Sequence, residues 1–150
     1  MKRIVALLLL LSLHLSLTAC SKKQSAADIL GEVCREYPIS AQIYSSLSAE
    51  DEEGYIDAEM MTALFGMDSC PVSEFAVVLY GKVDTVREIG VFITDNGDER
   101  IRVSELLSRR ISFLSSFSSG EGFIRKYRGV LVYGFVEDAS CLEELLDSIL

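Results

Sequence analysis

The spacing of apolar residues changes along the chain, and this change predicts an α+β fold. Before Pro71 the apolar residues recur at helical intervals, whereas two runs of β-forming residues follow, at 75–80 and 89–94. Two further strands are predicted at 123–127 and 130–136. The runs at 75–80 and 130–136 are apolar at both odd and even positions, which indicates strands with two buried faces.

Helical spacing predicts two helices before the first strand. Ser25 and Asp28 have capping-box spacing, and the apolar residues that follow recur every three or four positions until Pro38. Asp57 is placed to cap a second, short helix, and Gly66 to end it in a left-handed conformation.

Two more helices are predicted, one between the two pairs of strands and one at the end of the chain. The first begins between Asp98 and Ser104 and has Phe117 as the last residue of its apolar face. The second begins at Asp138 or Ser140. The predicted order is α-α-β-β-α-β-β-α, an antiparallel four-stranded sheet with helices covering one face.

The first twenty residues have the features of an export signal. Lys2 and Arg3 precede an apolar run at 4–13, and Leu-Thr-Ala-Cys at 17–20 resembles the lipobox of bacterial lipoproteins, whose cysteine receives a diacylglycerol. The run is too short to span a bilayer as a permanent helix. We therefore expect a lipoprotein signal peptide at 1–19, a lipidated Cys20 and tether at 20–27, and a single α+β domain at 28–150. The alternative is an ordinary cleaved signal that happens to end in cysteine.

Charge restricts the partners of such a domain. Cleavage before Cys20 would remove Lys2, Arg3 and the one histidine, His14, which leaves twelve of the fourteen basic residues against all 23 acidic ones, a net charge of −11. Nucleic acid needs a basic footprint, so we expect no nucleic-acid partner. We expect attachment to the extracytoplasmic face of the cell membrane through the lipid on Cys20.

The cysteines other than Cys20 leave two alternatives. Cys34 and Cys141 are each predicted on the apolar side of a helix, so they are the favoured pair for a disulfide in an exported protein. Alternatively Cys34, Cys70 and Cys141 are free thiols that pack as small apolar residues. Their spacing matches no zinc motif, and we expect no metal or cofactor.

Several stretches together resemble a known protein family. These are the lipobox, Leu-Phe-Gly-Met-Asp at 64–68, the strand at 75–80, Glu-Ile-Gly-Val-Phe at 88–92 and the long helix that follows. They resemble small lipoproteins of anaerobic Gram-positive bacteria, known as a domain of unknown function. The similarity covers most of 57–138, although the link at 118–121 is shorter here and lacks the family's proline. The resemblance implies a surface lipoprotein and supplies no catalytic residue.

Catalytic candidates are confined to carboxylates. With no histidine after cleavage, Ser–His–Asp and Cys–His catalysis are excluded. Glycoside hydrolysis needs two acids that flank a cleft, and the acids at 50–53 with Asp57 and Glu59 are near one another in sequence, although such runs are usually solvated loops. Glu88 lies in a strand among apolar residues, where burial would raise the pKa of a carboxyl group. Residues 95–99 superficially suggest a calcium loop but lack its ligand order, and turn and capping chemistry explains them better.

Basic residues gather in one part of this acidic chain. They are Arg109, Arg110, Arg125, Lys126 and Arg128. They could form a face for an acidic partner, a wall polymer or a phosphate, or they could flank a helix end and protect a sheet edge from strand pairing. The leading hypothesis is a non-enzymatic, lipid-anchored module that binds an unknown protein or cell-wall component. The alternatives are a carboxylate-dependent hydrolase of wall or glycan substrates and a calcium-dependent module.

Overall fold

The computed structural model describes residues 23–67, 69–82 and 85–150. The predicted signal peptide and Cys20 lie outside the described residues, as does Asp68 of the family resemblance. The elements, in chain order, are α2 (Ala26–Glu36), β1 (Ile43–Ser45), α3 (Ala58–Phe65), β2 (Glu74–Tyr80), β3 (Arg87–Ile93), α4 (Gly97–Ser115), β4 (Glu121–Tyr127), β5 (Val130–Val136) and α5 (Ala139–Ile149).

The sheet has five strands rather than the predicted four. All neighbours are antiparallel, and the strand order is β1-β2-β3-β5-β4. The additional strand is β1, which pairs with β2 through Ile43 opposite Val78. Three residues are too short to show an alternating pattern, so β1 was not distinguishable from a loop in the sequence. The element order is therefore α-β-α-β-β-α-β-β-α.

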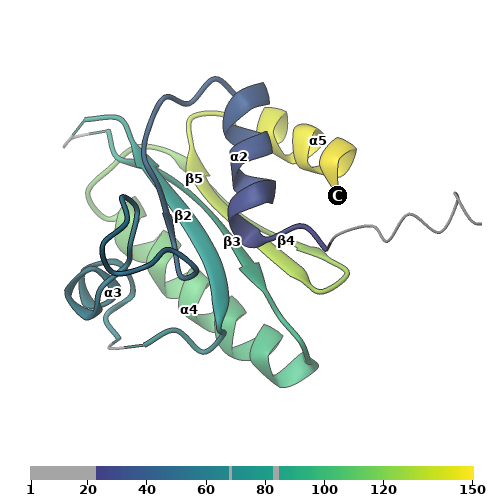
Figure 1. Cartoon of the computed structure of the whole chain (residues 1–150). Helices are drawn as coiled ribbons and strands as arrows, with labels where there is room; N and C mark the ends of the chain where they lie inside the picture. The colour runs from purple at the N-terminus through teal and green to yellow at the C-terminus, as the bar shows by residue number, and fades with distance from the viewer. Residues whose placement is uncertain (1–22, 68, 83–84) are drawn as a thin grey trace, which may run out of the picture.

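Helices cover both faces of the sheet, which corrects the prediction that they cover one (Figure 1). Consecutive strand residues point to opposite faces. Val78 belongs to a core cluster that includes α2 and α5, whereas its neighbour Val77 belongs to a cluster that includes α3 and α4. Both faces need cover because the central strands are apolar at odd and even positions alike.

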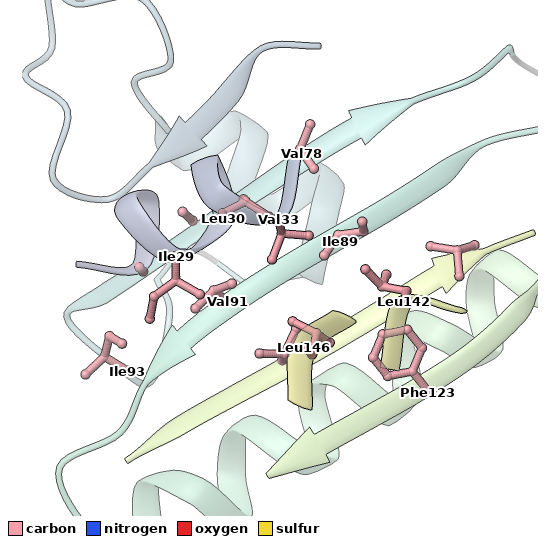
Figure 2. Close-up of a cluster of buried hydrophobic side chains, with 14 residues drawn as sticks. Ile29, Leu30, Val33, Val78, Ile89, Val91, Ile93, Phe123, Leu142 and Leu146 are labelled. Carbon is pink, nitrogen blue, oxygen red and sulfur yellow. The ribbon is translucent and has the colours of Figure 1, made fainter. Parts of the chain in front are cut away.

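The first cluster lies between the sheet and the α2–α5 layer. Figure 2 shows α2 side chains such as Leu30 and Val33 against β2 and β3, while Leu142 and Leu146 of α5 lie over β5 and β4. All four of these leucine and valine side chains are fully buried. The α2–α5 layer therefore closes one face of the sheet with aliphatic packing.

Local capping signals in the sequence correctly located three helix ends. Ser25 and Asp28 form the capping box of α2, and Asp57 accepts a hydrogen bond from the Met60 amide at the start of α3. Gly66 ends α3 with φ 68°. These caps form between residues three or four apart, which is why their spacing reveals them.

The folded part of the chain begins before residue 28, where the sequence placed the end of the tether. Ala26 opens α2, is fully buried, and donates its backbone N–H to the Glu74 carboxylate at 2.8 Å. The tether predicted at 20–27 therefore loses its last residues to the first helix. Of the two proposed caps for α5, Asp138 is the one that accepts from the Cys141 amide.

Helix α4 is displaced towards the N-terminus relative to its prediction. Asn96 caps it, so the helix begins at Gly97 instead of between Asp98 and Ser104. It ends at Ser115, and Phe117 beyond that end is 49% exposed rather than part of the apolar face. The turn at 95–99 thus serves as a helix start, and the Glu99 carboxylate accepts from the Asp95 amide at 2.8 Å.

Candidate functional site

A buried polar network lies between the sheet and α4. Glu88 of β3 is fully buried, and its carboxylate accepts Nε–H of Arg110 at 2.9 Å and Nη2–H at 2.5 Å. The Tyr133 hydroxyl on β5 donates to the same carboxylate. Arg110 also directs Nη1 towards the Ala63 carbonyl of α3 at 3.5 Å. Two strands and two helices are therefore connected through one carboxylate and one guanidinium.

A glycine makes room for the tyrosine of this network. Gly90 lies opposite Tyr133 in the β3–β5 register, and a Cβ on Gly90 would lie 2.2 Å from the Tyr133 ring. Burial, followed by the Glu88 charge, raises the pKa of Tyr133 well above its usual value near 10. The hydroxyl stays protonated and can keep donating to Glu88 at physiological pH.

Glu88 is occupied by these partners rather than presented to solvent. The guanidinium of Arg110 also makes a cation–π contact with Phe113, whose ring centroid lies 5.6 Å from Cζ. Both carboxylate oxygens of Glu88 accept hydrogen bonds from within the fold. The network therefore connects α4 and α3 with the sheet.

A hollow lies on one side of α3, where this helix faces β1 and β2. We call it the α3/β1 hollow; it has a volume of about 580 Å³, within the range of small-molecule pockets. Its surface is mainly apolar and is formed by Tyr44, Met60, Ala63, Leu64 and Leu79.

Polar groups are few in the α3/β1 hollow. Gln42, Asp57 and Glu59 contribute them. One oxygen of Asp57 is committed to the start of α3, 2.6 Å from the Met60 amide, whereas Glu59 makes no ion pair with another described residue. Two of the acids named as catalytic candidates thus share one hollow. The other acids, at 50–53, lie on an exposed loop outside its lining.

A second hollow lies between α3 and α4 and adjoins the first at Ala63 and Leu64, which line both. We call it the α3/α4 groove; it has a volume of about 460 Å³. Phe65, Leu106 and Phe113 form its apolar walls, and its ionisable side chains are Arg109 and Arg110.

The five basic residues named as a binding face do not form one surface. Arg110 is buried in the network, and Arg109 is exposed beside it on α4. Arg125 makes an ion pair with Glu143 of α5 at 3.0 Å, and Lys126, the next residue of β4, points to the opposite face. Arg128 is exposed in the turn before β5. Of these five residues, Arg109 and Arg110 line the α3/α4 groove together.

The structure contains Cys34, Cys70 and Cys141 as free thiols, which was one of the two alternatives, and Cys34 and Cys141 are not joined in it. Cys141 is exposed at the start of α5 rather than buried, which corrects the expectation that it points inward. Burial raises the pKa of Cys34, and that of Cys70 to about 11. Both thiols are therefore protonated and weakly nucleophilic near neutral pH.

Within 23–67, 69–82 and 85–150, no group of three or more His, Cys, Asp or Glu residues is arranged to hold a metal ion. In the same residues, no helix has the length and apolar character needed to cross a membrane.

Comparison of the chain with protein-family models, curated proteins and solved structures gave no match. The resemblance to small Gram-positive lipoproteins therefore stays a prediction.

The role of Arg110 was missed in the sequence, although a signal for it exists. Arg110 follows the buried residues Val103 and Leu107 of α4 by seven and three positions and precedes Leu114 by four, so it lies on the apolar face of the helix. A charged residue on that face implies a buried partner. Glu88, the acid in an apolar strand, is that partner.

Proposed function

We propose that this protein is a lipid-anchored, extracytoplasmic module that binds a protein or cell-wall component without catalysing a reaction. The α3/β1 hollow is the observation that carries the proposal, because it offers an apolar surface with a few polar groups at its edge. Such a composition is typical of binding pockets. The predicted lipid on Cys20 would hold the module at the membrane.

The buried ion pair supports a binding function over a catalytic one. Glu88 is the carboxylate that the sequence singled out among apolar residues, and Arg110 and Tyr133 occupy it. The α3/β1 hollow does not include Glu88 and has no basic side chain in its lining. Its ligand is therefore expected to present an apolar group and no excess of negative charge.

Site-specific photo-cross-linking of the full chain in intact cells tests this proposal. A photoreactive residue at Met60, inside the α3/β1 hollow, should give a discrete adduct in the membrane fraction. The same residue at Glu144, on the exposed side of α5, is the matched control and should give none. A Cys20→Ala chain should leave the membrane fraction and lose the Met60 adduct.

Two outcomes would contradict the proposal. Identical adducts from positions 60 and 144 would show that the α3/β1 hollow has no specific occupant. Asp57 and Glu59 in one hollow are also what the alternative, a carboxylate-dependent hydrolase, requires. Hydrolysis of wall glycan by the unmodified chain, abolished by Glu59→Gln, would establish that alternative instead.

A further inference from the structure

We propose that the α3/α4 groove is a second binding site, which takes a carboxylate attached to an apolar group. The chemistry is that of a small aliphatic or aromatic acid, or of the last residue of a peptide. The two hollows adjoin each other at Ala63 and Leu64, which line both, but they have different ionisable residues. The inference rests on Arg109 and Arg110 and therefore does not depend on the α3/β1 hollow.

The first observation that supports a carboxylate site is that buried Arg110 has N–H groups without a good acceptor. Arg110 is 8% exposed and has five N–H groups, of which Nε–H and one on Nη2 are held by Glu88. Nη1 reaches the Ala63 carbonyl at 3.5 Å, which is longer than a good N–H···O bond. Because Arg110 lines the groove, a carboxylate there would be a better acceptor for these remaining N–H groups than the distant carbonyl is.

Arg109 supplies a charge that nothing in the described chain neutralises. It lines the same groove, is exposed, and has no hydrogen bond or ion pair with any described residue. Glu105, one turn earlier on α4, does not form an ion pair with it. Since Glu88 already balances Arg110, Arg109 gives the groove a net positive charge within an acidic chain.

The apolar lining of the groove indicates that the ligand's carboxylate is attached to an apolar group. Leu106 is buried at its base, and Phe65 and Phe113 stand at its sides. Phe113 is 56% exposed, yet its ring is held between the Arg110 guanidinium and the Phe117 ring, whose centroid is 5.1 Å away with an edge-on geometry. An apolar group beside the carboxylate would cover the exposed Phe113 ring and displace water from both arginines.

An NMR titration of the full chain in nonionic detergent micelles tests the proposal. N-acetyl-phenylalanine should shift the backbone amide signals of Phe65, Leu106 and Phe113 saturably. Its neutral amide should bind about tenfold more weakly, because one charge-assisted contact is lost. Arg109→Gln should weaken binding of the acid by a similar factor. Arg102→Gln removes the same charge from an exposed position on α4 outside the groove and should leave binding unchanged.

A longer ligand distinguishes the two sources of the carboxylate. A tripeptide with a free C-terminal phenylalanine that binds at least about tenfold more tightly than the small acid would identify a peptide terminus as the natural occupant. Equal affinities would identify a small acid. Equal binding of acid and amide, unchanged binding by Arg109→Gln, or the absence of saturable shifts would overturn the proposal.

Discussion

At the scale of the residue, the pairing of Glu88 with Arg110 is the most consequential feature of the structure. Each charge is buried, and each is made acceptable by the other and by the Tyr133 hydroxyl. Removal of one partner leaves an uncompensated charge in the interior, whereas removal of both leaves no buried charge and only the Tyr133 hydroxyl without its acceptor. The two kinds of change therefore have different consequences for stability.

Each single substitution in this pair should destabilise the fold strongly, and the double substitution should cost much less than the two single costs added together. We expect Glu88→Leu and Arg110→Met each to lower the free energy of unfolding by about 3–5 kcal/mol, and the double variant to lose much less than the sum. Urea unfolding monitored by circular dichroism measures this. Arg125→Met, in a half-exposed ion pair, is the control and should cost at most about 1 kcal/mol. Equal costs for Arg110→Met and Arg125→Met would contradict the buried network.

At the scale of the element, helix starts show how far local chemistry specifies this fold. Asn96 accepts the Glu99 amide at 2.9 Å, and its own amide group donates to the Glu99 carboxylate at 3.0 Å. Asp98 lies inside the first turn, where its negative charge interacts favourably with the helix dipole. The cap of α4 thus consists of two reciprocal hydrogen bonds between Asn96 and Glu99, and Asp98 adds only its favourable charge.

The two residues at the start of α4 should differ when they are replaced. We expect Asn96→Ala to lower the free energy of unfolding by about 1 kcal/mol, because the first-turn amide of Glu99 loses its acceptor. Asp98→Ala should cost only about 0.3–0.5 kcal/mol, and less in high salt. Chemical unfolding at low and high ionic strength provides both values. A larger loss from Asp98→Ala would mean that the helix begins where the sequence placed it, not at Gly97.

At the scale of the whole molecule, tyrosines connect the sheet with the layers on both faces. Tyr133 lies under α4, whereas Tyr127 of β4 donates to Asp147 of α5 at 2.8 Å. Burial, followed by the hydrogen bond to Asp147, raises the pKa of Tyr127 to about 12. Burial is also the main cause of the raised pKa of Tyr80. Each of these groups favours the folded state while it is protonated.

Stability should therefore fall in alkaline solution. A tyrosine in the unfolded chain loses its proton near pH 10, whereas these tyrosines keep theirs in the folded state, so the folded state holds more protons above that pH. Their contribution is fully present below pH 10 and declines as pH rises towards 12 and beyond. Tyr133, which is fully buried, contributes up to about 1.4 kcal/mol per pH unit to this decline. In urea unfolding, Tyr133→Phe should leave the pH dependence of stability unchanged near pH 8 and reduce its slope by about one proton near pH 11. An unchanged slope near pH 11 would contradict the buried hydroxyl.

Local patterns of the sequence determined the class of the fold and most of its elements. The strand β5 has the predicted bounds, and Asp57, Gly66 and Asp138 end or begin their helices as expected. The same patterns indicated an export signal and a lipid acceptor at Cys20, which lie outside the described residues. These features depend on residues within a few positions of one another, so periodicity and capping chemistry are sufficient to reveal them.

Only the tertiary structure decided how the elements meet. It added β1 as an edge strand, placed helices on both faces, and divided the basic residues between the interior, two sheet faces and a turn. It also joined Glu88 to Arg110, 22 positions away, and formed two adjacent hollows along α3. Such outcomes depend on which side chains share a buried space after the sheet has formed, and spacing along the chain does not contain that information.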